Sequence, residues 1–265
     1  MASPVRQIFA FSGVLESGPG EKESFALVEH AISLAARPHA GPAREQAGPT
    51  REQAGPTREQ AGPTRVCYVP TAVGDAQAAI DFYQGKFAAR AGVQLSVLRL
   101  FTQPSVPDVA AHLLGQDVIL VEGGSVVNLM AVWRAHGLPR ILRRCWAAGV
   151  VLAGASAGSL CWHTGGPTDS FSDRLGPFTG GLRLVPYSNG VHDDFPGQPR
   201  REVYRALVAQ GILAGGYATE DGTGLHYRGT ALHEAVSIRP GKHAWRVDAA
   251  PGGGYREEPI EPRLI

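Results

Sequence analysis

Five short apolar segments, separated by segments of helical periodicity, constrain the fold more than any other feature of this chain. The apolar segments cover residues 7–11, 65–70, 94–101, 117–124 and 149–154, and the helical ones cover 22–36, 75–91, 107–114 and 126–148, the last with a break at Leu138–Pro139. Most of the apolar segments lack polar alternation, which is typical of strands buried on both faces of a parallel sheet. Strands that alternate with helices predict a doubly wound, mostly parallel α/β fold.

The pattern changes beyond about residue 180. Here we expect a strand at 183–187, a helix at 199–211, and short strands near 216–219, 224–228, 234–238 and 243–247. A chain of 265 residues is long enough to bury one large core. We therefore predict a single domain over residues 1–265.

Residues 40–65 repeat the heptapeptide AGPTREQ, with the first copy varied as AGPAREQ. Every unit carries Gly-Pro and none has an apolar seam, which argues against a coiled coil. The segment also has too little apolar surface to offset the entropy lost on ordering. We predict a flexible insertion between the first helix and the second strand.

The overall composition excludes several classes of partner. The net charge is +1 with no basic block, so we expect no nucleic-acid partner. The apolar run near the N-terminus is too short for a signal peptide or a membrane span. Three cysteines without metal-like spacing favour buried thiols in a reducing compartment. These features predict a cytoplasmic protein without a membrane partner.

The strand at 149–154 runs into the motif Gly154-Ala155-Ser156-Ala157-Gly158. It fits G-x-S-x-G, in which a serine on a tight strand-to-helix turn is held at strained backbone angles with its hydroxyl outward. Glycines flank such a turn because backbone and helix pass too close for a Cβ. We predict Ser156 as a nucleophile; the alternative is a glycine-rich loop that Ser156 caps.

A serine nucleophile needs backbone donors for the oxyanion. The N–H of Ala157, at the predicted helix start, is one candidate. Gly123 and Gly124 end the preceding strand in VEGGS, and either could supply the second donor.

The serine also needs a general base and a carboxylate that orients it. His192 lies in a polar loop just past a predicted strand end, where functional side chains are commonly presented. Asp169 in GGPTDSF and Asp221 in ATEDGTG are the candidate acids. Each also suits a turn or a helix cap, so the pattern alone leaves the choice open.

Several motifs occur together and in order: GASAGS, TDSF, NGVHDDF, an arginine-rich helix start and ATEDGTGLHYRG. With them the sequence resembles the peptidase E family of serine peptidases, the aspartyl dipeptidases, whose more distant relatives are the cyanophycinases. The resemblance covers nearly the whole chain outside the repeat. It implies a class I glutamine-amidotransferase-like α/β fold, with Ser156 as nucleophile and His192 as general base.

For the acid, the resemblance favours Asp169, which matches the position usually assigned in aspartyl dipeptidases. Asp221 matches a glutamate of cyanophycinase-like members, so Asp221, with its neighbour Glu220, is the alternative. Arg200 matches the arginine that binds the substrate aspartate, and an Arg–carboxylate contact would supply both affinity and geometry.

The sequence thus predicts a serine peptidase for dipeptides with N-terminal aspartate, using neither metal nor cofactor. A cyanophycinase-like β-aspartyl peptidase or an esterase with the same triad is the first alternative. A non-catalytic binding protein on this scaffold is the second. Homo-oligomerisation stays open.

Overall fold

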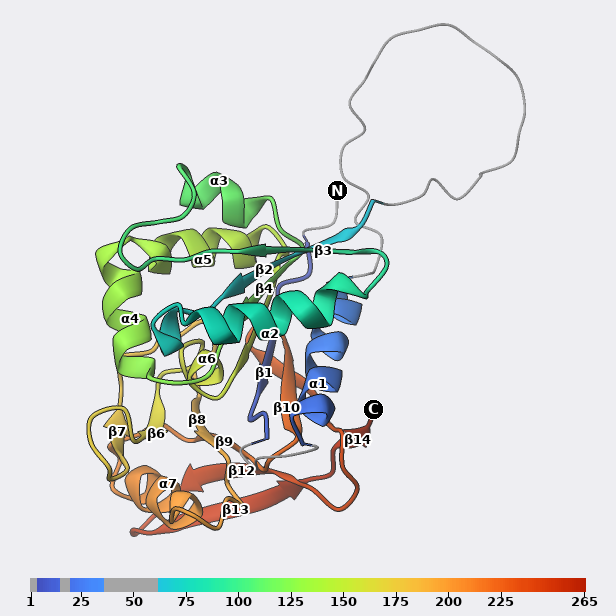
Figure 1. Ribbon diagram of the computed structural model, residues 1–265. Helices are drawn as coiled ribbons and strands as arrows, with labels where there is room; N and C mark the ends of the chain where they lie inside the picture. Colours follow the sequence, from blue (N-terminus) through green and yellow to red (C-terminus); the bar gives the residue numbers. More distant parts are fainter. Residues whose placement is uncertain (1–3, 15–19, 36–61) are drawn as a thin grey trace, which may run out of the picture.

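An eight-stranded sheet forms the centre of the computed structural model, which describes residues 4–14, 20–35 and 62–265 (Figure 1). The strand order is β14-β11-β10-β1-β5-β4-β2-β3. The eight strands are β1 Gln7–Phe11, β2 Thr64–Val69, β3 Val93–Val97, β4 Val118–Val121, β5 Val151–Ala155, β10 Thr223–Arg228, β11 Ala231–Ser237 and β14 Arg263–Leu264. Within this sheet β10 alone runs antiparallel to its neighbours. The predicted mostly parallel sheet is confirmed.

Helices cover both faces of this sheet (Figure 1). On one face lie α1 (Gly20–Ala35) and α2 (Gln77–Ala88); on the other lie α3 (Val109–Leu114), α4 (Val126–Ala135) and α5 (Leu138–Ala147). Successive residues of β1 therefore enter different cores, Phe9 with α1 and Ile8 with α4. This two-sided burial explains why the strand segments are apolar at consecutive positions. The predicted helix break falls between α4 and α5, at Gly137 in a left-handed conformation.

A second sheet lies beside the end of the large sheet at which β5 terminates (Figure 1). It has the order β13-β12-β9-β8. Its strands are β8 Ser188–Val191, β9 Gly216–Thr219, β12 Ala244–Ala249 and β13 Tyr255–Ile260. Helix α7 (Arg200–Ala209) packs on it through Tyr204 and Val208. Smaller elements are η1 (Thr71–Val73), α6 (Ala157–Leu160) and the hairpin β6 (Gly166–Thr168) and β7 (Gly176–Phe178).

One predicted strand is wrong. Residues 183–187 are irregular, and β8 begins only at Ser188. The backbone N–H groups of Leu182 and Leu184 donate to the carbonyls of Cys161 and Trp162, and Arg183 has a φ of 55°. This segment is apolar because it wraps the end of α6, and its backbone donors are used there instead of in a sheet.

The predicted insertion at 40–65 lies outside the described residues as far as residue 61, and its last residues, Thr64 and Arg65, open β2. All three cysteines are buried free thiols, as predicted. Among the described residues, no helix combines the length and the apolar character needed to cross a membrane.

Candidate active site

Ser156 stands on the turn between β5 and α6, with φ 51° and ψ −108°. A non-glycine residue held in such a region stores about 1–3 kcal/mol of strain. Its flanking glycines are sterically required: a Cβ on Gly154 would overlap the carbonyl oxygen of Gly158, and one on Gly158 would overlap that of Val121. The local geometry is that of the nucleophile elbow predicted from the motif.

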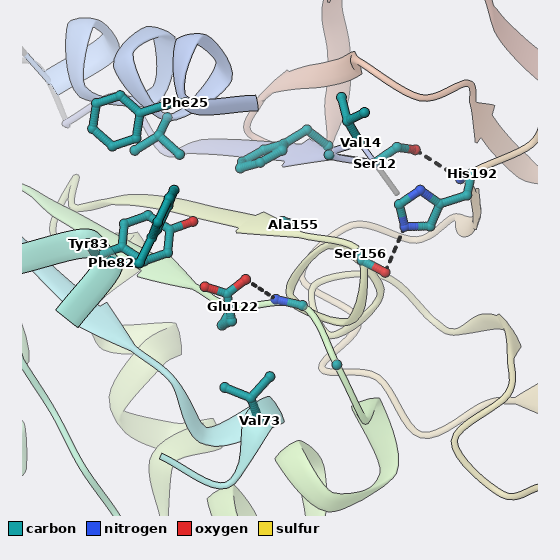
Figure 2. Close-up of a pocket in the computed structure, with 15 residues that line it drawn as sticks. Ser12, Val14, Phe25, Val73, Phe82, Tyr83, Glu122, Ala155, Ser156 and His192 are labelled. Carbon is teal, nitrogen blue, oxygen red and sulfur yellow. Dashed lines mark hydrogen bonds between the residues drawn. The ribbon is translucent and has the colours of Figure 1, made fainter. Parts of the chain in front are cut away.

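A continuous hydrogen-bond chain joins Ser156 to a histidine and a carboxylate. His192 Nε2 lies 2.9 Å from Ser156 Oγ, and Figure 2 shows the two side chains facing one another. On the other side of the ring, His192 Nδ1 lies 2.5 Å from Asp221 Oδ1. The His192 and Asp221 side chains are only 2% and 7% exposed. In this arrangement Nδ1–H donates to the carboxylate, and Nε2 accepts from the serine hydroxyl.

The structure places Asp221, and not Asp169, beside His192, which corrects the preference taken from the resemblance. Asp169 Oδ2 instead accepts from Arg200 Nη2 at 3.2 Å and from Gln198 Nε2 at 3.0 Å. Glu220 also points elsewhere, accepting from the backbone N–H of His243. The physical reason is topological: Asp221 lies two residues past β9, and β9 pairs with β8, the strand that ends just before His192, whereas Asp169 follows the separate hairpin strand β6.

Two anchors hold the His192 loop in place. The His192 backbone N–H donates to Ser12 Oγ at 3.0 Å, and this hydroxyl also contacts Thr219 of β9. The next residue, Asp193, is buried and paired with Arg201 and Arg205 of α7. The arginine-rich start of α7 therefore includes residues that fix the loop carrying the imidazole.

Of the predicted oxyanion donors, Gly124 and Ala157 are available and Gly123 is not. The N–H of Gly123 donates to Glu122 Oε1 at 3.0 Å. The N–H of Gly124 has no partner among the described residues, and that of Ala157, the first residue of α6, has none within its helix. Gly124 has φ 122°, and a Cβ there would lie 2.5 Å from the carbonyl oxygen of Ala72, so this position requires glycine.

Glu122 was not identified from the sequence, although it precedes the two glycines in VEGGS. Its carboxylate accepts from Tyr68 Oη and from the Tyr83 hydroxyl as well as from Gly123. Burial raises the pKa of Glu122, and these hydrogen bonds oppose the rise. An acidic residue directly after an apolar strand and directly before Gly123 and Gly124 was the signal available in the sequence.

Glu122 also lines a cavity of about 290 Å³ that opens beside Ser156. Figure 2 shows aromatic side chains of Phe25, Phe82 and Tyr83 on the wall of this cavity away from His192. Among the described residues that line it there is no lysine or arginine, and Glu122 is the acidic one. The cavity is therefore mostly apolar, and Glu122 is the one carboxylate among its described lining residues.

Arg200, the predicted substrate-binding arginine, is the first residue of α7 and is 7% exposed. Its Nη2 is bound by Asp169, while its Nε is buried without a hydrogen-bond partner in the described part of the chain. Burial lowers the pKa of the Arg200 guanidinium, and the charges of Asp169 and Asp221 oppose this. Arg200 is thus a buried cation close to the carboxylate of the hydrogen-bond chain.

Comparison with known structures shows the same fold elsewhere. A peptidase from an acI-B1 Actinobacterium superposes with a TM-score of 0.62 at 17% identity, covering 97% of this chain and 95% of that one. A protein from Listeria monocytogenes EGD-e, named for peptidase E, superposes with a TM-score of 0.57 at 16% identity, covering 89% of this chain and all of that one. These matches confirm the expected α/β fold of the class I glutamine-amidotransferase type.

Sequence comparison gives the family. The profile of peptidase family S51 matches residues 49–235. An uncharacterized peptidase of Bacillus subtilis (strain 168), YgaJ, is 39% identical over 177 residues, which are 66% of this chain and 74% of that protein. On these two matches the chain belongs to peptidase family S51, a family of serine-type peptidases, and its substrates are peptides.

Proposed function

We propose that Ser156 is the nucleophile of this peptidase, His192 its general base and acid, and Asp221 the carboxylate that orients the imidazole. The hydrogen-bond chain from Ser156 Oγ through His192 to Asp221 is the observation that carries this proposal. As Oγ attacks the scissile carbonyl carbon, its proton moves to His192 Nε2. The imidazolium then protonates the leaving amine, the C–N bond breaks, and water hydrolyses the acyl-enzyme by the same relay.

The backbone N–H groups of Gly124 and Ala157 stabilise the oxyanion in this proposal. Their availability supports it, since neither is used by a neighbouring group within the described residues. Removing one such donor typically lowers the rate about 10²–10³-fold.

The substrates that fit best are short peptides with a free N-terminal aspartate. Glu122 is a carboxylate in a cavity without a cationic lining residue among those described, so the α-ammonium group of the substrate suits it. Arg200 carries an unpartnered buried Nε and suits the side-chain carboxylate. Contacts to both charged groups would select aspartate at the N-terminus over other residues.

Serine labelling tests the catalytic proposal. A fluorophosphonate probe should label the wild-type chain stoichiometrically at Ser156, and Ser156→Ala should abolish both labelling and hydrolysis while the protein stays folded. Ser159→Ala is a matched control for labelling, because Ser159 is fully buried in α6. A Ser156→Ala variant that hydrolyses peptides at the wild-type rate refutes the mechanism. An unlabelled wild-type protein favours a binding protein instead.

A substrate panel tests the specificity. We expect L-aspartyl-leucine to be cleaved faster than leucyl-leucine, N-acetyl-aspartyl-leucine, β-aspartyl-arginine or a nitrophenyl ester. Arg200→Met should lower kcat/KM for aspartyl-leucine about 10–100-fold, as expected for a lost charge-assisted contact of about 1.5–3 kcal/mol. Arg174→Met, at an exposed loop position, is the control and should leave kcat/KM for aspartyl-leucine unchanged. Equal rates on all substrates would leave the serine mechanism intact and refute the specificity.

A further inference from the structure

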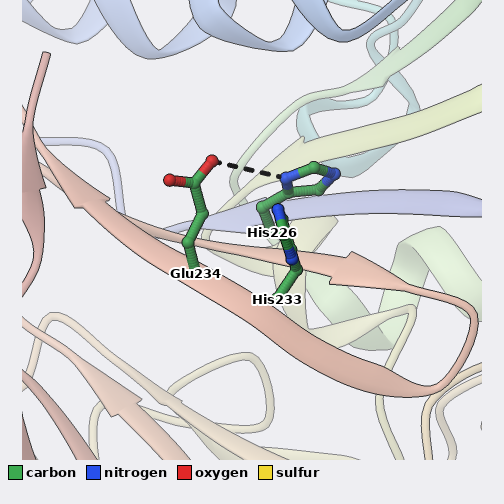
Figure 3. A group of neighbouring side chains, drawn as sticks. All are labelled: His226, His233 and Glu234. Atoms are coloured by element: carbon green, nitrogen blue, oxygen red, sulfur yellow. Dashed lines mark ion pairs between the residues drawn. The ribbon is translucent and has the colours of Figure 1, made fainter.

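Three side chains capable of binding a metal ion converge on β10 and β11, on the face of the sheet that α1 covers. His226 comes from β10, and His233 and Glu234 come from β11; their ligating atoms all lie within 4.8 Å of one another (Figure 3). A cavity of about 310 Å³ is lined by His226 and Glu234, and also by Gln7 of β1 and His30 of α1. None of these side chains takes part in the proposed peptidase reaction.

A β-bulge brings the two ligands of β11 together. His226 pairs with Glu234 and Tyr227 with Leu232, so His233 is the extra residue on its strand. In a regular strand, consecutive side chains point to opposite faces, but a bulge re-aims one of them. The rings of His226 and His233 consequently lie 5.3 Å apart, and Figure 3 shows both beside the Glu234 carboxylate.

The hydrogen bonds of Gln7 determine which nitrogen of His226 is free. Gln7 Nε2 donates to the carbonyl oxygen of Leu34, so Gln7 Oε1 is left to accept from His226 Nε2–H at 3.0 Å. His226 Nδ1 then carries a lone pair and no proton. Metal-bound histidines typically donate their other ring N–H to such an oxygen.

The lone pair of His226 Nδ1 faces a second acceptor. Glu234 Oε1 lies 3.6 Å away, and Nδ1 is buried without a hydrogen-bond partner among the described residues. The other oxygen, Glu234 Oε2, is held by Arg263 Nε at 2.9 Å. Two facing acceptors with no proton between them favour a cation.

We propose that His226 Nδ1, His233 and Glu234 Oε1 form a binding site for a divalent transition-metal ion, with Zn²⁺ as the best match. Two imidazoles and one carboxylate are a common zinc ligand set. Tetrahedral Zn²⁺ with bonds of about 2.0–2.1 Å needs ligand atoms about 3.4 Å apart. The Nδ1–Oε1 pair, at 3.6 Å, is close to this spacing, and the exposed His233 can close the remaining gap.

The position of the site argues for a structural role. His226 of β10 lies opposite Phe9 of β1, and Phe9 lies opposite Ala153 of β5. His226 is therefore two strands away from β5, at the level of the residue three positions before Ser156. This separation is about 10 Å in each direction. A bound ion would join β10 to β11 and, through Glu234 and Arg263, to the C-terminal strand β14. It should stabilise this edge of the sheet without altering turnover.

Titration of the full chain, freed of any affinity tag and of metal, tests the proposal. Wild-type protein should bind one Zn²⁺ in calorimetry, and Co²⁺ should give the visible absorption of a tetrahedral site. His233→Ala, at an exposed position, should weaken Zn²⁺ binding at least about tenfold. His136→Ala, which removes a half-buried histidine at the end of α4, is the matched control and should bind like wild type.

Melting temperature provides a second measurement. Zn²⁺ should raise the melting temperature of wild type and of His136→Ala but not of His233→Ala, because only binding to the folded state stabilises it. Glu234→Gln should behave like His233→Ala. Wild-type protein that binds no Zn²⁺, or a His233→Ala variant that binds it as tightly as wild type, overturns the proposal.

Discussion

Asp221→Asn should lower kcat about 10³–10⁴-fold while leaving the fold intact. The substitution preserves the shape of the side chain but removes the charge facing His192 Nδ1 at 2.5 Å. At an effective dielectric constant of about 20, two unit charges at this distance interact by about 7 kcal/mol. The amide retains a contact with the ring, so we expect about 4–5.5 kcal/mol of this stabilisation to be lost when the imidazolium forms.

The assay compares this variant with Asp169→Asn on L-aspartyl-leucine, measuring kcat and KM at neutral pH, with circular dichroism as the check on folding. Asp169 is 42% exposed and bound to Arg200, so its loss should change KM by less than about tenfold and kcat only slightly. The reasoning is refuted if Asp221→Asn retains kcat within tenfold of wild type while Asp169→Asn loses about a thousandfold.

Three further outcomes follow from the site and its surroundings. Gly124→Ala should lower kcat about 10²–10³-fold, because it displaces a proposed oxyanion donor. It should also lower the melting temperature, because the new Cβ would meet the carbonyl oxygen of Ala72. Wild-type kinetics for this variant would exclude Gly124 as an oxyanion donor. Glu122→Gln should raise KM for free aspartyl-leucine about tenfold and leave KM for the N-acetylated peptide unchanged. An equal rise in KM for both peptides would contradict binding of the substrate ammonium group by Glu122. The free energy of unfolding should fall as the pH drops from about 6.5 to 4, because burial lowers the pKa of His163 from 6.5 to about 4 and only the unfolded chain takes up its proton in that window. His163 contributes up to about 3 kcal/mol of this fall in denaturant titrations, and His163→Asn should flatten the profile; an unchanged slope would show that His163 does not contribute.

The fold and the strained turn at Ser156 were predictable because their signals are local. Strands buried on both faces leave consecutive apolar residues, as in β1, β2 and β4. The elbow at Ser156 leaves two obligatory glycines, since any Cβ there overlaps backbone. Sterics of this kind act between residues a few positions apart, so the sequence displays them directly.

The carboxylate beside His192, the carboxylate in the cavity and the bulge were not predictable in the same way. Asp169 and Asp221 occupy similar polar turns, and only the pairing of β8 with β9 brings Asp221 to His192. The apolar pattern of segment 183–187 suits either a buried strand or a loop that wraps a helix end. Which of the two forms depends on the part of the chain that packs against the segment, here the end of α6. Likewise, His226 and His233 become neighbours only through the register shift between β10 and β11. Each outcome depends on contacts between distant parts of the chain.

Ser156 follows β5 of the eight-stranded sheet, whereas His192 and Asp221 lie on loops of the second sheet. Ser12, which follows β1, contacts both the His192 loop and Thr219 of β9 and so connects the two sheets. A nascent chain that is released or stalled before residue 221 lacks Asp221 and therefore cannot complete the hydrogen-bond chain to Ser156. In the proposed mechanism, hydrolysis would begin only once the second sheet has formed and docked, so the order of translation itself would keep unfinished copies of this protease inert.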